Sequence, residues 1–399
     1  MSEHRHPGTQ KAWLPGIEAL RGIAALTVVS HHMWTLSREP RFPGSFLMEG
    51  FGNWGVNLFF MLSGFLLAET FWNERPADLR VYWIRRIFRI APAYYVNVAI
   101  LFLFFAGPHL VFSQTGAKQV AASFTFTHAL FPSTASSLNV NGALWTLTIE
   151  MMLYAFLPLL ALAVKRAPWL SLALIALTGL AWRGLVAFAG DGLREFYFHG
   201  AAVDTGVESL FIARQFIGAL AIFALGIGAR WLVVRGHCAR VYRWFPRMST
   251  SLFILMAIPS ALLLHWVERG SNFRNGLFFV GYDFVVMLLM VPALIMAAYP
   301  GEFSPSPLRS VSTWLGERSY SIYLWHFPLI LAVYERGPLR HLPATGGYAW
   351  RLPLVLVLTL VFASVSYATV ERPGMEWGRR ITQRLRQPQP QPTKERALA

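Results

Sequence analysis

The chain has 399 residues, of which 55% are hydrophobic and only 14% are charged, and its mean hydropathy is +0.44. Soluble domains carry about 25% charged residues, and apolar runs recur here along the whole sequence, so a soluble globule with one anchor is excluded. The single cysteine, Cys238, excludes an intramolecular disulfide framework and a multi-cysteine metal site. The net charge of +15 lies mainly in short loops between apolar runs, which is typical of membrane topology and not of nucleic-acid binding.

The apolar runs predict an all-α integral membrane protein, a bundle of about ten transmembrane helices. A shorter apolar stretch at 118–131 is interrupted by polar residues, so we expect it to be interfacial or re-entrant. The ten predicted spans lie near 17–36, 52–71, 88–107, 146–164, 169–189, 209–233, 248–267, 276–299, 315–334 and 350–371.

Loop charge predicts the orientation of these spans. With a cytoplasmic N-terminus, most loop arginines and lysines fall on the inner side, and Arg336 and Arg340 are exceptions on the outer side. Both termini are therefore predicted to be cytoplasmic, in a multi-pass protein of the plasma (inner) membrane. We expect the first run to be a retained helix and not a cleaved signal peptide. The predicted inner basic residues are Arg75, Arg80, Arg85, Arg86, Arg89, Lys165, Arg166, Arg235, Arg240, Arg243, Arg247, Arg372, Arg379, Arg380, Arg384 and Arg386.

Three segments follow from this topology. Residues 1–16 form a cytoplasmic N-terminal segment, and residues 17–372 form one transmembrane domain. Residues 373–399 form a basic, Pro/Gln-rich cytoplasmic tail whose end is predicted to be disordered.

The first predicted helix carries ionisable residues inside an apolar run. Arg21 and His32 are eleven residues apart, so they share a helical face to within about 20° and lie about 16 Å apart along the axis. Glu18 is within pairing reach of Arg21, whereas His31 points about 80° away from it. One interpretation is structural, a boundary ion pair and a packing histidine; the other is functional, because intramembrane ionisable groups are costly.

Several ordered motifs carry a resemblance to a known family. "IEALRGIAALTVVSHH" contains an arginine, ten residues and a histidine, and it is followed by "VNLFFMLSGFLL", "RRIFRIAPAYY", "LWTLTIEMMLY", "SYSIYLWHFPL" and "VERP". In this order and spacing they resemble acyltransferase family 3, membrane-integral enzymes that O-acylate carbohydrates and related molecules. Family members usually have Asp-Gly where this chain has Glu18-Ala19.

The resemblance implies transfer of an acetyl or other short acyl group from acyl-coenzyme A to a carbohydrate hydroxyl, on a cell-surface glycan or a lipid-linked sugar. Acyl-coenzyme A is then a co-substrate, and no permanently bound cofactor or metal is expected. A neutral histidine suits removal of the hydroxyl proton, so His32 is the predicted general base. Arg21 is predicted to position the donor, and Glu18 to orient Arg21.

Further residues are candidates for binding. Arg85, Arg86 and Arg89 precede the third span on the inner side, where forked guanidinium groups suit the phosphates of coenzyme A, although the positive-inside rule alone also places arginines there.

The predicted substrate-binding residues come from two helices. One set is Trp145, Glu150 and Tyr154, and the other is Ser319, Tyr323 and His326. The structural alternatives are an interfacial tryptophan for the first set and interhelical hydrogen bonds for the second.

Three rival functions stay open from the sequence. In the first, the enzyme acylates a small cytoplasmic molecule such as a macrolide sugar. In the second, the protein is a transporter or acyl-group exporter. In the third, it is a structural membrane protein. An exporter also needs buried charge along a pathway, but no convincing internal repeat is found.

Overall fold

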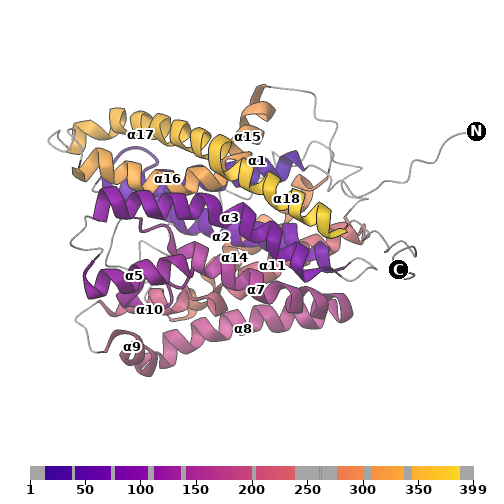
Figure 1. The fold of residues 1–399 in the computed structure, drawn as a ribbon. Coiled ribbons are helices and arrows are strands. Elements are labelled where there is room, and N and C mark those ends of the chain that lie inside the picture. Colours follow the sequence, from indigo (N-terminus) through magenta and orange to yellow (C-terminus); the bar gives the residue numbers. More distant parts are fainter. Residues whose placement is uncertain are drawn as a thin grey trace, which may run out of the picture.

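The computed structural model describes residues 14–37, 41–72, 77–106, 112–135, 141–199, 204–238, 260, 262, 276–299, 307–336 and 344–386. Every regular element in these ranges is a helix. The long axes of most helices run in one direction (Figure 1). The helices are α1 (Pro15–Leu36), α2 (Phe46–Ala68), α3 (Leu79–Leu101), α5 (Gln114–Phe124), α6 (Pro132–Ala135), α7 (Trp145–Arg166), α8 (Pro168–Ala189), α9 (Asp191–Phe198), α10 (Thr205–Ala213), α11 (Phe216–Val234), α14 (Gly276–Ala297), α15 (Pro307–Glu317), α16 (Ser319–Leu331), α17 (Ala344–Ser366) and α18 (Arg372–Arg386).

Seven helices of the described ranges are long and apolar enough to cross a membrane. They lie at Phe46–Phe71, Leu79–Phe104, Trp145–Arg166, Pro168–Ala189, Phe216–Val234, Phe279–Ala297 and Arg351–Arg386. Helix α1 is 22 residues long but is not among them, because its polar residues lower its hydropathy. The predicted span at 248–267 falls almost wholly outside the described residues.

Two of the predicted spans are not single helices. The run at 209–233 is divided between α10 and α11, because Arg214 and Gln215 form a turn and the Gln215 amide donates to the carbonyl oxygens of Ala129 and Phe211. The run at 315–334 is divided at Arg318 into α15 and α16. The shorter apolar stretch at 118–131 contains the end of α5, an 11-residue helix too short to span.

The last span extends further than the sequence predicts. After α17 the helix widens into a π-helical turn at Tyr367–Glu371 and continues as α18 to Arg386. Residues 373–386 of the predicted tail are therefore helical and pack on α3, where Gly378 allows close contact with the Phe88 side chain. The rest of the predicted tail lies outside the described residues.

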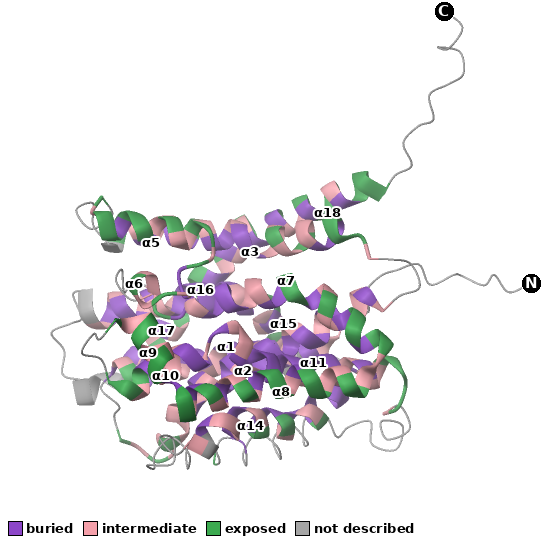
Figure 2. Cartoon of the chain, turned by 90° about the horizontal axis from the view of Figure 1, so that it is seen from below, coloured by how far each residue is buried: buried purple, intermediate pink, exposed green. Residues whose placement is uncertain are grey.

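Helix α1 lies in the core of the bundle, with α2, α15 and α16 against it (Figure 2). Glycine makes the closest approach possible: a Cβ on Gly316 would lie 2.1 Å from the backbone oxygen of Glu18. Such small residues let membrane helices pack backbone to backbone. The polar residues of α1 are thereby held inside the protein.

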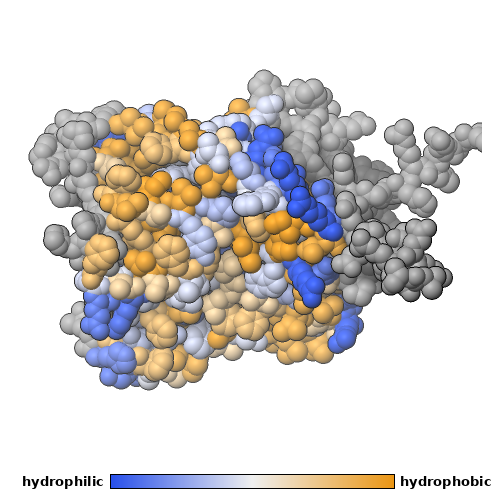
Figure 3. All heavy atoms as spheres, viewed as in Figure 1, coloured by the Kyte–Doolittle hydropathy of each residue, from blue (hydrophilic) through white to orange (hydrophobic). Residues whose placement is uncertain are grey.

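The surface divides by hydropathy. Apolar side chains cover most of the face seen in Figure 3, and hydrophilic residues gather over α18. Large apolar side chains are also exposed on α8, including Trp169, Leu170 and Leu177. An apolar exterior of this kind is what a bilayer stabilises.

Charged residues inside the bundle are also used structurally. Arg183 of α8 forms a 2.9 Å ion pair with Asp283 of α14 and donates to the Phe279 carbonyl oxygen. Asn57 of α2 donates to the same carboxylate at 2.9 Å. This compensated pair connects three helices.

Candidate active site

His32 contacts a second histidine on a distant helix. Its Nδ1 lies 2.9 Å from His326 Nε2, and the two rings stack with centroids 5.1 Å apart. The Nδ1 atom of His326 lies 2.7 Å from the backbone oxygen of Tyr323, one turn earlier on α16. We call His32 and His326 the histidine pair.

The hydrogen bonds assign the protons of this pair. A carbonyl oxygen can only accept, so His326 Nδ1 carries a proton and, in the neutral ring, its Nε2 is an acceptor. His32 Nδ1 must then donate to it, which leaves the lone pair of a neutral His32 on Nε2. His32 is partly exposed, and its Nε2 has no hydrogen-bond partner among the described residues. The arrangement holds a neutral imidazole with an available acceptor nitrogen.

His31 has a different environment. Its Nδ1 lies 2.8 Å from the backbone oxygen of Met48, and its ring packs on Gly52 of α2, where a Cβ would come within 2.4 Å. The rings of His31 and His32 are 5.3 Å apart at an angle of 64°. The two adjacent histidines thus face different helices, as the helical geometry predicts.

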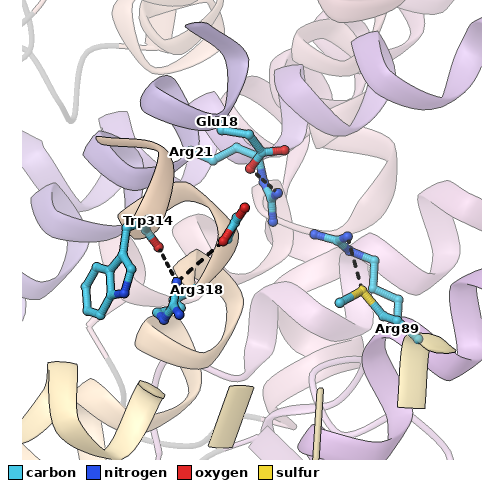
Figure 4. Close-up of polar contacts among 7 residues, drawn as sticks. Glu18, Arg21, Arg89, Trp314 and Arg318 are labelled. Atoms are coloured by element: carbon cyan, nitrogen blue, oxygen red, sulfur yellow. Dashed lines mark hydrogen bonds and ion pairs between the residues drawn. The ribbon is translucent and has the colours of Figure 1, made fainter. Parts of the chain in front are cut away.

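Arginines from three parts of the chain converge near Glu18 and Arg21 of α1. Arg21 is buried and donates to Glu18 Oε2 at 2.7 Å. Arg89 of α3 and Arg318 of the α15–α16 junction extend toward the same region (Figure 4). Arg21, Arg89 and Arg318 all interact electrostatically with Glu371. We call these three arginines, with Glu18 and Glu371, the arginine cluster.

The two carboxylates do not saturate the arginine cluster. Glu371 is fully buried and accepts a 2.7 Å hydrogen bond from Ser321 through Oε2, while its Oε1 has no hydrogen-bond partner among the described residues. Within the same ranges Arg89 donates only to the Met375 sulfur, at 3.8 Å, which is a weak acceptor. Much of the donor capacity of these guanidinium groups is therefore left for a bound anion.

The three arginines predicted to bind the donor lie on two different faces of α3. Arg86 and Arg89 lie on the α3 face that also carries Tyr82, and both interact electrostatically with Tyr154 and Glu150. Arg86 has no ion pair or hydrogen bond within the described residues. Arg85 is exposed and faces the basic residues of α18. Since adjacent helical residues point about 100° apart, one face cannot hold Arg85 and Arg86 together.

Glu150 and Tyr154 of α7 form a hydrogen-bonded group with α2. The Tyr154 hydroxyl donates to Glu150 Oε1, and the Ser63 hydroxyl of α2 donates to the same oxygen at 3.0 Å. Both residues interact electrostatically with Arg86 of α3. They lie more than one helical turn along α7 from Trp145, its first residue.

The remaining candidates differ in what they contact. The Tyr323 hydroxyl donates to the Ala143 oxygen at 2.6 Å and lies 2.7 Å from Thr146 Oγ1. Ser319 is fully buried. Trp145 is partly exposed and lies under the guanidinium of Arg214, 5.3 Å from the ring centre.

Comparison with known proteins decides the family. A family model described as "Acyltransferase domain" matches residues 14–368. The chain belongs to acyltransferase family 3. This membership makes it an enzyme that transfers acyl groups, and with its apolar helices it is a multi-pass membrane protein.

Named relatives of this acyltransferase are mostly O-acetyltransferases. It is 27% identical over 384 residues to the peptidoglycan O-acetyltransferase OatA of Listeria monocytogenes, covering 91% of this chain and 56% of that protein. It is 24% identical over 381 residues to the O-acetyltransferase OatA of Staphylococcus aureus, covering 90% and 57%. A putative acetyltransferase of Acidianus two-tailed virus is 27% identical over 327 residues, covering 81% and 85%. The chain thus spans just over half of the OatA proteins, and no solved structure matches it.

Sequence reasoning missed four residues of this acyltransferase near the predicted site. The Ser63 hydroxyl bonds to Glu150, Arg214 lies over Trp145, and Glu371 interacts electrostatically with Arg21, Arg89 and Arg318. Ser63 and Glu371 lie within quoted motifs, and Arg318 directly precedes another. Arg214 interrupts the apolar run at 209–233, and an ionisable residue inside a predicted span is a functional candidate by default. That signal was present in the sequence.

Proposed function

We propose that this acyltransferase moves an acetyl or other short acyl group from acyl-coenzyme A to a hydroxyl of a cell-surface or lipid-linked carbohydrate, in the plasma membrane. The observation that carries the proposal is the histidine pair, which leaves His32 Nε2 as an available proton acceptor. A general base for a hydroxyl needs this kind of nitrogen.

The reaction proceeds by direct transfer at His32. The acceptor hydroxyl gives its proton to His32 Nε2 while its oxygen attacks the thioester carbonyl carbon. The C–S bond then breaks, and the leaving sulfur takes the proton from His32 Nε2. The products are the carbohydrate ester and free coenzyme A, and His32 returns to its neutral form.

The arginine cluster and the neighbouring Arg86 supply the site for the donor's phosphates. Arg86 and Arg89 form no ion pair with a carboxylate of the described residues, and guanidinium forks match phosphate oxygens. Arg21 and His32 lie about 16 Å apart along α1, so the donor's arm extends between the two sites. Coenzyme A stays on the cytoplasmic side, and only the acyl group reaches the acceptor.

Similarity to the OatA proteins supports a carbohydrate acceptor. Their names describe O-acetylation, in one case of peptidoglycan, and the similarity covers about nine-tenths of this chain. The purified chain in lipid nanodiscs, given acetyl-coenzyme A and a short glycan, is expected to add one acetyl mass to the glycan. His32→Gln should abolish the product and His31→Gln should not. A glycan that gains no acetyl group from the wild-type chain, under conditions where the protein is folded, would overturn the proposal.

The orientation is tested separately. Arg85→Cys and Asp191→Cys, each in a Cys238→Ser background, place single thiols at exposed positions. An impermeant thiol reagent on intact cells should label position 191 and not position 85. The reverse pattern would put the arginine cluster on the side without coenzyme A and contradict the mechanism.

A further inference from the structure

Arg214 lies at the break between α10 and α11. Its backbone N–H closes α10 on the Leu210 oxygen, and the next residue, Gln215, is the N-cap of α11. The side chain is partly exposed, on the same part of the molecule as Trp145 and Asn53. A residue in such a turn projects from the ends of two helices and is not confined to one helical face.

The contacts of Arg214 are all with uncharged groups. Its Nη2 donates to the Asn53 Oδ1 atom, and the guanidinium lies over the Trp145 ring at 5.3 Å from the centre. No carboxylate of the described residues pairs with it.

Arg86 and Arg89 also lack an ion pair within the described residues, but three other arginines there show the usual compensation. Arg183 pairs with Asp283, Arg194 with Asp191, and Arg230 with Glu69. Arg214 shares their partly buried setting without a counter-charge, which is costly unless an anion is supplied.

A short chain of contacts connects this uncompensated charge with the histidine pair. Arg214 lies over Trp145, the neighbouring Thr146 contacts the Tyr323 hydroxyl at 2.7 Å, and the Tyr323 backbone oxygen bonds to His326. Arg214 also interacts electrostatically with His32 and with Tyr323. Of the two substrates, the donor carries its charge on the phosphates. Under the proposed function these are held at the arginine cluster, about 16 Å from His32 along α1. A counter-charge for Arg214 is therefore expected from the acceptor.

We propose that Arg214, fixed by Asn53 and Trp145, binds an anionic group of the acceptor, so that the enzyme selects acidic glycans over neutral ones. This inference rests on the proposed function. A guanidinium stacked on an aromatic ring keeps its outer edge free, and that edge matches a carboxylate or phosphate with two parallel hydrogen bonds.

The test uses the full chain in nanodiscs and three matched probes. These are a short oligosaccharide with a free carboxylate, its neutral methyl ester, and the same oligosaccharide carrying a phosphate monoester. Binding is measured without donor, and acetylation is measured with acetyl-coenzyme A. Wild-type protein should bind an anionic probe about 10- to 100-fold more tightly than the ester, the range expected for a charge-assisted hydrogen bond. The tighter of the two anionic probes identifies the group.

The variants separate recognition from other roles. Arg214→Gln should remove the preference while leaving binding of the ester unchanged, and Arg214→Lys should keep part of it. Arg194→Gln, which removes an arginine already paired with Asp191, is the control and should preserve the preference. Equal loss of acetylation with the anionic probes and the ester would assign Arg214 to oxyanion stabilisation or to folding and overturn the inference.

Failure of the proposed function gives a different result. If the wild-type chain binds the anionic probe selectively but acetylates nothing, the proposed reaction is wrong and Arg214 recognition stands. If it acetylates the ester and the anionic probes equally, the reaction stands and the Arg214 inference is wrong.

Discussion

The histidine pair and the arginine cluster lie on one helix and are built in opposite ways. At the histidine pair every assigned proton has one acceptor, and a single nitrogen, His32 Nε2, is left available. At the arginine cluster, Arg21, Arg89 and Arg318 lie around Glu18 and Glu371, Arg318 also pairs with Glu317, and Arg89 has a sulfur as its one acceptor among the described residues. The first arrangement is suited to moving one proton at a defined atom, and the second to holding an anion of variable shape.

The two tasks differ in how completely the protein satisfies the hydrogen bonds of the groups involved. A general base needs a defined tautomer, which requires a complete set of partners around it. A phosphate site needs donors that the protein itself leaves partly unused. Variants of the two regions should therefore affect different kinetic parameters.

Loss of the base should have the largest effect. His32→Gln removes the proton acceptor and is expected to lower kcat by about 100- to 10,000-fold, the usual contribution of a general base. His31→Gln should stay within a few fold, because His31 bonds to the Met48 oxygen and not to the histidine pair. Initial rates on equal amounts of folded protein check this. A more severe effect of His31→Gln would refute the assignment of the base.

His326 should act as a positioning residue. His326→Leu removes the acceptor for His32 Nδ1, so we expect kcat to fall by about 10- to 100-fold while the KM for acetyl-coenzyme A stays unchanged. His326→Gln should recover part of the rate, because its amide oxygen can accept the same hydrogen bond. Equal rates for the two variants would show that the hydrogen bond to His32 is not the reason for the loss.

Variants of Arg86 and Arg89 should change the affinity of the enzyme for the donor. Arg86→Gln or Arg89→Gln each removes a charged phosphate donor, and the KM for acetyl-coenzyme A is expected to rise about 10- to 100-fold with little change in acceptor KM. Arg85→Gln is the matched control on the same helix, because Arg85 is exposed, and should change it less than threefold. A raised acceptor KM with unchanged donor affinity would contradict the phosphate site.

The compensated ion pair should have the smallest effect on catalysis. Arg183→Gln leaves Asp283 without its cation inside the bundle, which costs about 3–5 kcal/mol in buried settings and lowers the thermal midpoint. The specific activity of the remaining folded enzyme should be unchanged with respect to both KM values. A selective change in either KM would move this pair from the scaffold into the substrate path.

The sequence predicted the content of α1 well and its surroundings poorly. Helical periodicity alone separates His31 from His32 and pairs Glu18 with Arg21, since both depend on local geometry. The partner of His32 is nearly three hundred residues away, and the Ser-Tyr-x-x-Tyr-x-x-His helix gave no distance to it. Such contacts depend on tertiary packing, which no local pattern encodes.

Helix boundaries failed where polar side chains compete with the backbone. Hydropathy treats Arg214 and Arg318 as interruptions within a span, whereas each ends one helix and begins another. The π-helical turn at Tyr367–Glu371 is likewise invisible to composition, although it precedes the buried carboxylate of Glu371. The family motifs mark the α15–α16 junction and the Glu371 region in the sequence, but they do not describe the geometry of either.

Helix α1 has its only proline at its first position, unlike α3, α7, α14, α16 and α17, which carry one inside. Since sharp kinks arise mainly at internal prolines, α1 has no such residue to bend it between Arg21 and His32. Under the proposed function, the donor's phosphates are held near Arg21, so the length of its arm decides whether the thioester reaches His32. A thioester on a shorter arm would not reach the base, and a longer acyl chain would have to fit beyond His32.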